Sequence, residues 1–188
     1  MAVQQPTMPA PLALRPLTAR DEAEARRAHA ELAADGFEFL FSLRAAEPWA
    51  AYLARLISQS EGPDLRAGTV RGIFLVAEAG GSLVGRVSIR PELNASLSVV
   101  GGHIGFGVRP GCRRRGYAAA ILSQALVLTY DLGVGRALVT CDVGNVGSAA
   151  TIERCGGVLE GVVTAPGAMT PSRRYWIDTA PGAPSLDS

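Results

Sequence analysis

The sequence predicts a mixed α/β fold of the α+β type, with one central sheet and helices on both of its faces. Two patterns predict it. Strand-like segments come first as a hairpin and later alternate with helical segments, and Gly80-Gly81 joins two apolar runs as a tight turn with positive φ angles. The length of 188 residues favours one domain. We place it at residues 12–179, between flexible tails at 1–11 and 180–188.

The N-terminal part is expected to form one strand and two helices. Residues 12–17 are strand-like, and Thr18 and Asp21 form a capping pair that starts a helix over 19–34. A second helix over 48–59 has apolar side chains at spacings of three and four residues, which predicts one buried face. These side chains are Trp49, Tyr52, Leu53, Leu56 and Ile57.

The middle of the chain is expected to form a hairpin and a further strand. A loop over 60–68 precedes strands at 72–79 and 82–90, and residues 92–101 form either a strand or a loop. The strand at 103–108 has one bulky face and one bare face, which alternate as Ile104, Gly105, Phe106, Gly107 and Val108. A bare face lets a ligand or another backbone lie against the strand, or it simply allows close packing.

The C-terminal part alternates helices and strands. We expect a helix over 117–132 that ends at Gly133, and a buried, parallel-type strand over 136–141. A short helix follows at 146–155. The expected closing antiparallel strands are 158–164 and 173–178.

Composition excludes several classes of function. Eighteen basic residues nearly balance seventeen acidic ones, which argues against nonspecific binding to nucleic acid or to an anionic membrane. The three cysteines are odd in number and lack paired spacing, so neither a disulfide framework nor a metal site is expected. A reducing cytoplasm fits best. We find no signal-peptide pattern and no apolar run long enough to cross a bilayer.

A basic turn leads from the strand at 103–108 into the helix at 117–132. Its residues are Arg113, Arg114, Arg115, Gly116, Tyr117 and Ala118. The first N–H groups of a helix lack intrahelical partners and carry partial positive charge, so this turn suits a phosphate-rich ligand. A glycine lets the backbone approach a phosphate closely.

The turn resembles the acetyl-CoA loop of GNAT-type N-acetyltransferases, in which Gln or Arg, Gly and then Gly or Ala are spaced like Arg113, Gly116 and Ala118. The later Asn145 and the segments 102–110, 140–142, 156–157 and 174–177 resemble a poorly characterised bacterial branch of predicted acetyltransferases. The resemblance implies a mostly antiparallel sheet and acetyl-CoA as cosubstrate, without a metal.

The resemblance also implies an activity: direct transfer of an acetyl group, in a ternary complex, to an amine of a small molecule or a peptide terminus. In the family the turn binds pyrophosphate. Backbone N–H groups at Phe106, Gly107 and Val108 are then expected to polarise the thioester carbonyl and bind the pantetheine arm.

The family's usual proton donor, a Tyr on the helix after the fifth strand, is replaced here by Ile152. A related branch carries Ser three residues after an Asn, as in Asn145 and Ser148. Ser148 is therefore our candidate acid, although a serine at a helix start often only bonds to backbone. Asn145 is expected to orient the pantetheine amides, to cap the helix, or both.

The base is open among several groups. His103 has a suitable unperturbed pKa of roughly 6.5, but its place at the beginning of the strand also suits a packed histidine. Asp142, Glu92 or a water chain are the other options. Arg86 and Arg90, with the face of Trp49 and Tyr52, shape an acceptor pocket for an anionic or aromatic group, or are solvated arginines and core aromatics.

Two other readings stay open at this point. One is a noncatalytic acyl-CoA-binding or regulatory module, favoured by the missing Tyr. The other is nucleotide or nucleic-acid binding through Arg113, Arg114 and Arg115, which lacks an accompanying series of aromatic residues. A homodimer is possible.

Overall fold

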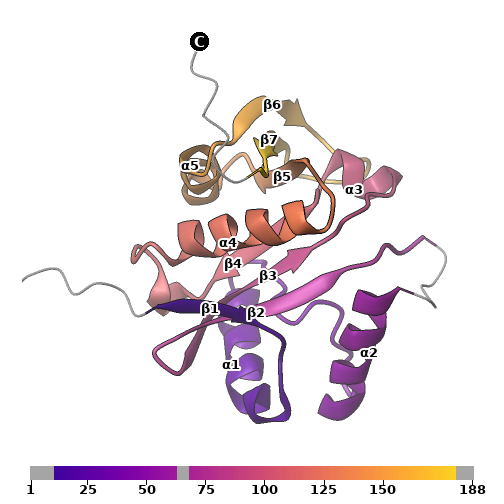
Figure 1. Cartoon of the computed structure of the whole chain (residues 1–188), viewed down its shortest axis with the longest axis vertical. Helices are drawn as coiled ribbons and strands as arrows, with labels where there is room; N and C mark the ends of the chain where they lie inside the picture. Colours follow the sequence, from indigo (N-terminus) through magenta and orange to yellow (C-terminus); the bar gives the residue numbers. More distant parts are fainter. Residues whose placement is uncertain (1–10, 63–67, 181–188) are drawn as a thin grey trace, which may run out of the picture.

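The computed structural model describes residues 11–62 and 68–180 (Figure 1). The predicted tails, apart from residues 11 and 180, and most of the predicted 60–68 loop lie outside these residues. The strands are β1 (Leu12–Arg15), β2 (Ile73–Ala79), β3 (Ser82–Ile89), β4 (Ile104–Val108), β5 (Arg136–Asp142), β6 (Val158–Val163) and β7 (Ser172–Asp178). The α-helices are α1 (Glu22–Ala33), α2 (Trp49–Glu61), α3 (Ala95–Val99), α4 (Tyr117–Asp131) and α5 (Val146–Arg154). Short 3-10 turns are η1 (Ala19–Asp21) and η2 (Pro110–Cys112).

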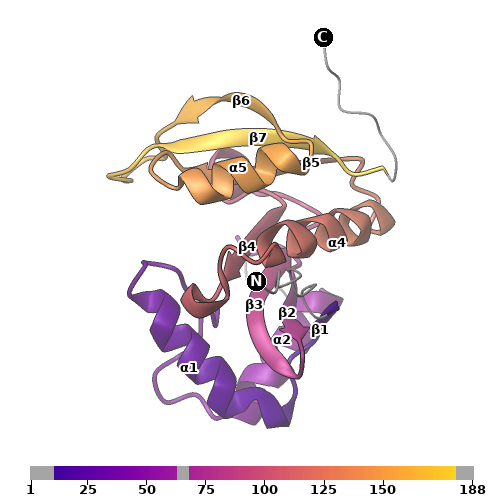
Figure 2. The ribbon, with the colours of Figure 1, turned by 90° about the vertical axis from the view of Figure 1, so that its left-hand side faces the viewer.

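The first sheet has the order β1-β2-β3-β4, and every neighbouring pair is antiparallel. Helices α1 and α2 cover one face and α4 covers the other, so the prediction of helices on both faces is confirmed (Figures 1 and 2). Between the sheet and α4 lies a core of aliphatic side chains that includes Val87, Ile104 and Ile121. The other face buries Trp49 and Tyr52 of α2.

A second sheet has the order β5-β7-β6 and is antiparallel as well (Figure 2). Two predictions about the sheets are wrong. The strands form two sheets where one was expected, and β5, predicted to be parallel-type, pairs antiparallel with β7. The local sequence of β5 is apolar enough for either arrangement, since pairing partners lie far away along the chain.

Among the described residues, backbone pairing joins the two sheets at one place. Gly102 forms an isolated antiparallel bridge with Val139, the backbone N–H of His103 donates to the Leu138 carbonyl at 2.7 Å, and the Leu138 N–H donates to His103 Nδ1 at 2.9 Å. Within the part of the chain that the structure describes, β4 and β5 share no further ladder. A cleft can therefore open between them.

The structure bears on the predictions for three local segments. The Thr18–Asp21 pair is confirmed, because the Thr18 N–H donates to the Asp21 carboxylate at 2.7 Å and the Thr18 hydroxyl at 2.8 Å. The segment 92–101, expected as strand or loop, contains helix α3 instead, whose first turn is capped by Asn94. Ile57 was expected to be buried, yet 57% of its surface is exposed.

The junction between the sheets depends on Gly102. This residue has φ = 64°, and an added Cβ would lie 2.2 Å from the Leu138 carbonyl oxygen. We predict that Gly102→Ala lowers the free energy of unfolding by about 3 kcal/mol, because strain and a backbone clash add. Gly133→Ala is the control, since Gly133 has φ = 85° and open space around it. It should cost about 1–2 kcal/mol from strain alone. Urea denaturation of both variants measures the difference, and equal costs would contradict the role of the junction.

Candidate active site

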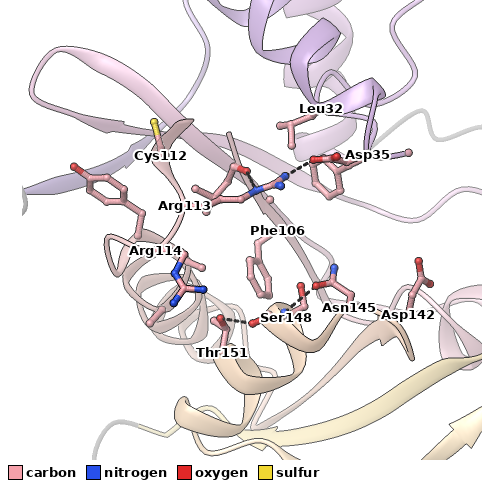
Figure 3. Close-up of a pocket in the computed structure, with 18 of the residues that line it drawn as sticks. Leu32, Asp35, Phe106, Cys112, Arg113, Arg114, Asp142, Asn145, Ser148 and Thr151 are labelled. Atoms are coloured by element: carbon pink, nitrogen blue, oxygen red, sulfur yellow. Dashed lines mark hydrogen bonds and ion pairs between the residues drawn. The ribbon is translucent and has the colours of Figure 1, made fainter. Parts of the chain in front are cut away.

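A cleft of about 900 Å³ lies where β4 and β5 separate (Figure 3). Its walls come from four places: the end of α1, the strand β4, the turn into α4, and the start of α5 after β5. These segments are far apart in sequence. The split between the two sheets brings them together.

The start of α4 supplies unpaired backbone donors to this cleft. Gly116 precedes the helix with φ = 82°, and the first intrahelical bond is donated by Ala120 to the Gly116 carbonyl. The cleft is lined by Gly116, Tyr117, Ala118 and Ala119, and no described side chain caps the helix. The N–H groups of residues 117–119 therefore remain available to an anion, as the sequence predicts.

The three predicted arginines do not act alike. Arg113 and Arg114 line the cleft, whereas Arg115 borders a separate groove. Arg113 forms an ion pair with Asp35 at 2.5 Å, and its Nε donates to the Val108 carbonyl at 3.2 Å (Figure 3). Arg113 thus links the turn to the end of α1.

One edge of β4 faces the cleft. The backbone N–H of Arg109 donates to the Val84 carbonyl, and the backbone N–H of Arg90 on the β3 side donates to the His103 carbonyl. The odd-numbered residues of β4 therefore pair with β3. Antiparallel pairing alternates, which directs the N–H groups of Phe106 and Val108 to the other side, towards the cleft. Both residues line it, as does Gly107.

The bare face of β4 is covered at Gly107 by the side chain of Phe37. An added Cβ on Gly107 would lie 2.5 Å from the ring of Phe37. Close packing, one of the two readings offered by the sequence, therefore describes Gly107. A ligand that binds β4 like an extra strand has the edge at Phe106 and Val108 open to it.

The start of α5 forms the opposite wall. Asn145 Oδ1 accepts the Ser148 N–H at 3.0 Å and so caps the helix, which leaves its Nδ2 group for a ligand. The Ser148 hydroxyl has no hydrogen-bond partner among the described residues, although the neighbouring Thr151 hydroxyl is bonded to the Gly147 carbonyl. Ser148 is half-buried in the cleft wall. Ile152, where the family's Tyr would stand, is fully buried in the core.

Of the two remaining predicted catalytic residues, one lies at the cleft and the other does not. Asp142 lies on the rim of the cleft and is exposed. His103 does not line it: Nδ1 is occupied by the Leu138 N–H, its ring lies 6.3 Å from that of Trp176, and burial lowers the pKa of the imidazole. A neutral ring with Nδ1 as acceptor carries its proton on Nε2. These contacts favour the packed histidine over the base.

Sequence reasoning missed the contribution of α1. Leu32, Asp35 and Phe37 enter the cleft from the end of this helix. No local pattern marks them, because their role comes from packing against β4 and Arg113 over more than sixty intervening residues. The described residues contain no cluster of His, Cys, Asp or Glu that could hold a metal ion, and no described helix is long and apolar enough to cross a membrane.

The family model of the acetyltransferase (GNAT) domain matches residues 12–158 of the chain. The chain therefore belongs to the GNAT family of acetyltransferases and is an enzyme of this class. A search of curated proteins found no match.

Solved structures share the fold at low sequence identity. Mycobacterium smegmatis RimJ in complex with CoA-disulfide has a TM-score of 0.65 and 21% identity, covering 89% of this chain and 81% of RimJ. The microcin C7 self-immunity acetyltransferase MccE, in complex with acetyl-CoA and AMP, has a TM-score of 0.62, 18% identity and coverages of 89% and 92%. Spermidine N-acetyltransferase from Vibrio cholerae, in complex with CoA and spermine, has a TM-score of 0.60, 20% identity and coverages of 89% and 95%.

Proposed function

We propose that the protein transfers an acetyl group from acetyl-CoA directly to a primary amine of a small molecule or a peptide terminus. The observation that carries this proposal is the uncapped start of α4, whose free N–H groups line a cleft between two diverging strands. Family membership supplies the reaction class.

The residues present fit acetyl-CoA. Its pyrophosphate is matched by the N–H groups of residues 117–119 and by Arg114, because helix starts and guanidinium groups both bind phosphate oxygens. Its pantetheine amides are matched by the cleft-facing edge of β4 at Phe106 and Val108. Asn145 Nδ2 on the opposite wall is a further donor to an amide carbonyl.

Acetyl-CoA supplies an activated acyl group when it is bound. The chain must orient the amine, remove a proton from it and donate a proton to the departing sulfur. Backbone N–H groups of β4 are positioned to stabilise negative charge on the reacting carbonyl oxygen. The unbonded hydroxyl of Ser148 is our proposed donor of a proton to the departing sulfur. Asp142, on the rim, or a water chain removes the proton of the amine. His103 has no part in this scheme.

Direct transfer requires both substrates to be bound at once. The Vibrio cholerae neighbour holds CoA and spermine in one complex, which supports this order on the shared fold. Initial-rate kinetics that depend on both substrates, with intersecting lines in double-reciprocal plots, would follow from a ternary complex. We further expect a cytoplasmic location, and a homodimer remains a prediction.

The first prediction concerns cofactor binding. Gly116→Val places a side chain in the space beside the free N–H groups, so we expect the affinity for CoA in isothermal titration to fall at least about tenfold, or roughly 1.4 kcal/mol. Gly133→Val is the control, because Gly133 has nearly the same φ and the same open surroundings but lies at the far end of α4. Equal affinities in the two variants would argue against this phosphate site.

The second prediction concerns the proton donor. Ser148→Ala should lower kcat about 100-fold while the affinity for CoA stays within about threefold, because general acid catalysis contributes roughly 10²–10⁴-fold. Thr151→Ala is the control, since that hydroxyl lies in the same cleft but is already bonded to the Gly147 carbonyl. A Ser148→Ala variant with unchanged kcat would remove Ser148 from the mechanism.

A further inference from the structure

Arg86 on β3 is a buried cation without an acidic partner. Only 5% of its surface is exposed, and its guanidinium stacks on the ring of Phe37 at 4.3 Å. Its hydrogen bonds go to neutral acceptors, which are Ser88 Oγ at 3.1 Å, the Gly105 carbonyl at 3.3 Å and the Glu38 carbonyl at 2.8 Å. Its buried Nε has no partner at all. The side chain is therefore short of one acceptor and of a counter-charge.

Arg90, two residues along β3, is a second such cation. Its Nη1 donates to the Gly102 carbonyl at 3.1 Å, and neither arginine forms an ion pair within residues 11–62 and 68–180. The nearby Glu38 carboxylate is turned towards the Ser42 N–H. Burial lowers the pKa of both arginines, that of Arg86 to about 10. Both arginines bond to neutral acceptors and lack a negative partner within the described chain. Two such positive charges at one place favour the binding of an anionic ligand.

The donors of these side chains converge over Gly105. A Cβ atom added to Gly105 would lie 3.2 Å from Ser88 Oγ and 3.9 Å from Nη1 of both Arg86 and Arg90. Gly105 has no such atom, and part of its surface is exposed to solvent. The Ser88 hydroxyl donates to the Gly105 carbonyl at 3.3 Å, so the donors left at this point belong to the two guanidinium groups, which suit a carboxylate.

This point adjoins the reaction cleft through β4 and Phe37. Gly105 directly precedes Phe106, which lines the cleft, and neighbouring residues of a strand are about 3.3 Å apart along its axis. Phe37 lines the cleft as well, contacts Gly107 and stacks on Arg86. A molecule with an amine a few bonds from a carboxylate can therefore bridge the two places.

We propose that the acceptor amine carries a carboxylate, as an amino acid does, and that Arg86 and Arg90 bind this carboxylate over Gly105. The proposal rests on the proposed acetyltransferase function and assigns its acceptor class. The two arginines repel polycations, so polyamines such as spermine are poor acceptors for this chain. Arg86 also holds the Phe37–Glu38 segment, whereas Arg90 serves chiefly as the more accessible anion-binding group.

The test compares matched acceptors that differ in the carboxylate. Free amino acids and their amides are assayed in pairs, such as phenylalanine with phenylalaninamide and glycine with glycinamide, with rates expressed per deprotonated amine. We expect kcat/KM for at least one free acid to exceed that of its amide at least tenfold. Arg90→Gln should abolish this preference by lowering kcat/KM for the acid, with the amide unchanged within about twofold.

Further variants control for folding. Arg90→Lys keeps the charge and should retain part of the preference, and Gly105→Ala, which fills the proposed carboxylate position, should lose it while CoA still binds. A wild-type enzyme that acetylates acids and amides equally would overturn the proposal, as would Arg90→Gln lowering both rates alike.

Binding measurements distinguish a failure of the proposed anion site from a failure of the proposed acetyltransferase function. Isothermal titration of each amino acid and its amide, with and without saturating CoA, reports on the anion site even if turnover is absent. Failure of CoA to bind would refute the proposed function, while selective binding of the acid, lost in Arg90→Gln, would still uphold the anion site. Equal or absent binding of acid and amide, together with absence of turnover for either, would refute the anion site.

Discussion

The isolated backbone bridge between the two sheets determines where ligands can bind. Gly102 forms one backbone bridge with β5. Next to it, the ring of His103 accepts the Leu138 N–H, which a backbone carbonyl would accept in a continued ladder. If the ladder continued, the N–H groups of Phe106 and Val108 would be consumed by β5. Because it stops, β4 keeps one free edge, and the ends of α1, α4 and α5 come to surround it.

The two sides of β4 then carry different chemistry. On the cleft side the donors are backbone N–H groups, which stay fixed and suit phosphate and amide oxygens whatever side chains surround them. On the α1–α2 side the donors are the guanidinium groups of Arg86 and Arg90, which form a compact cationic site beside Ser88. Phe37 separates these two environments and contacts both. An acceptor held by its anionic end on one side is directed towards the acyl group on the other.

The parts of this structure that the sequence predicts are those with local signals. The turn into α4 is recognisable because a basic run and Gly116 stand directly before an apolar helix, and the β2–β3 hairpin is recognisable from Gly80-Gly81. Helix α3 is missed because it has five residues and depends on the Asn94 cap more than on an apolar face. The contributions of Asp35 and Phe37, and the antiparallel pairing of β5, depend on contacts across the chain that no short pattern encodes.

The claim that the free edge of β4 and the start of α4 form the acetyl-CoA site is tested most directly by amide NMR of the labelled protein titrated with CoA. We expect the largest shift changes, and new protection from hydrogen exchange, at the amides of Phe106, Val108 and residues 116–119. Saturable changes confined to other elements, or no changes at millimolar CoA, would contradict it.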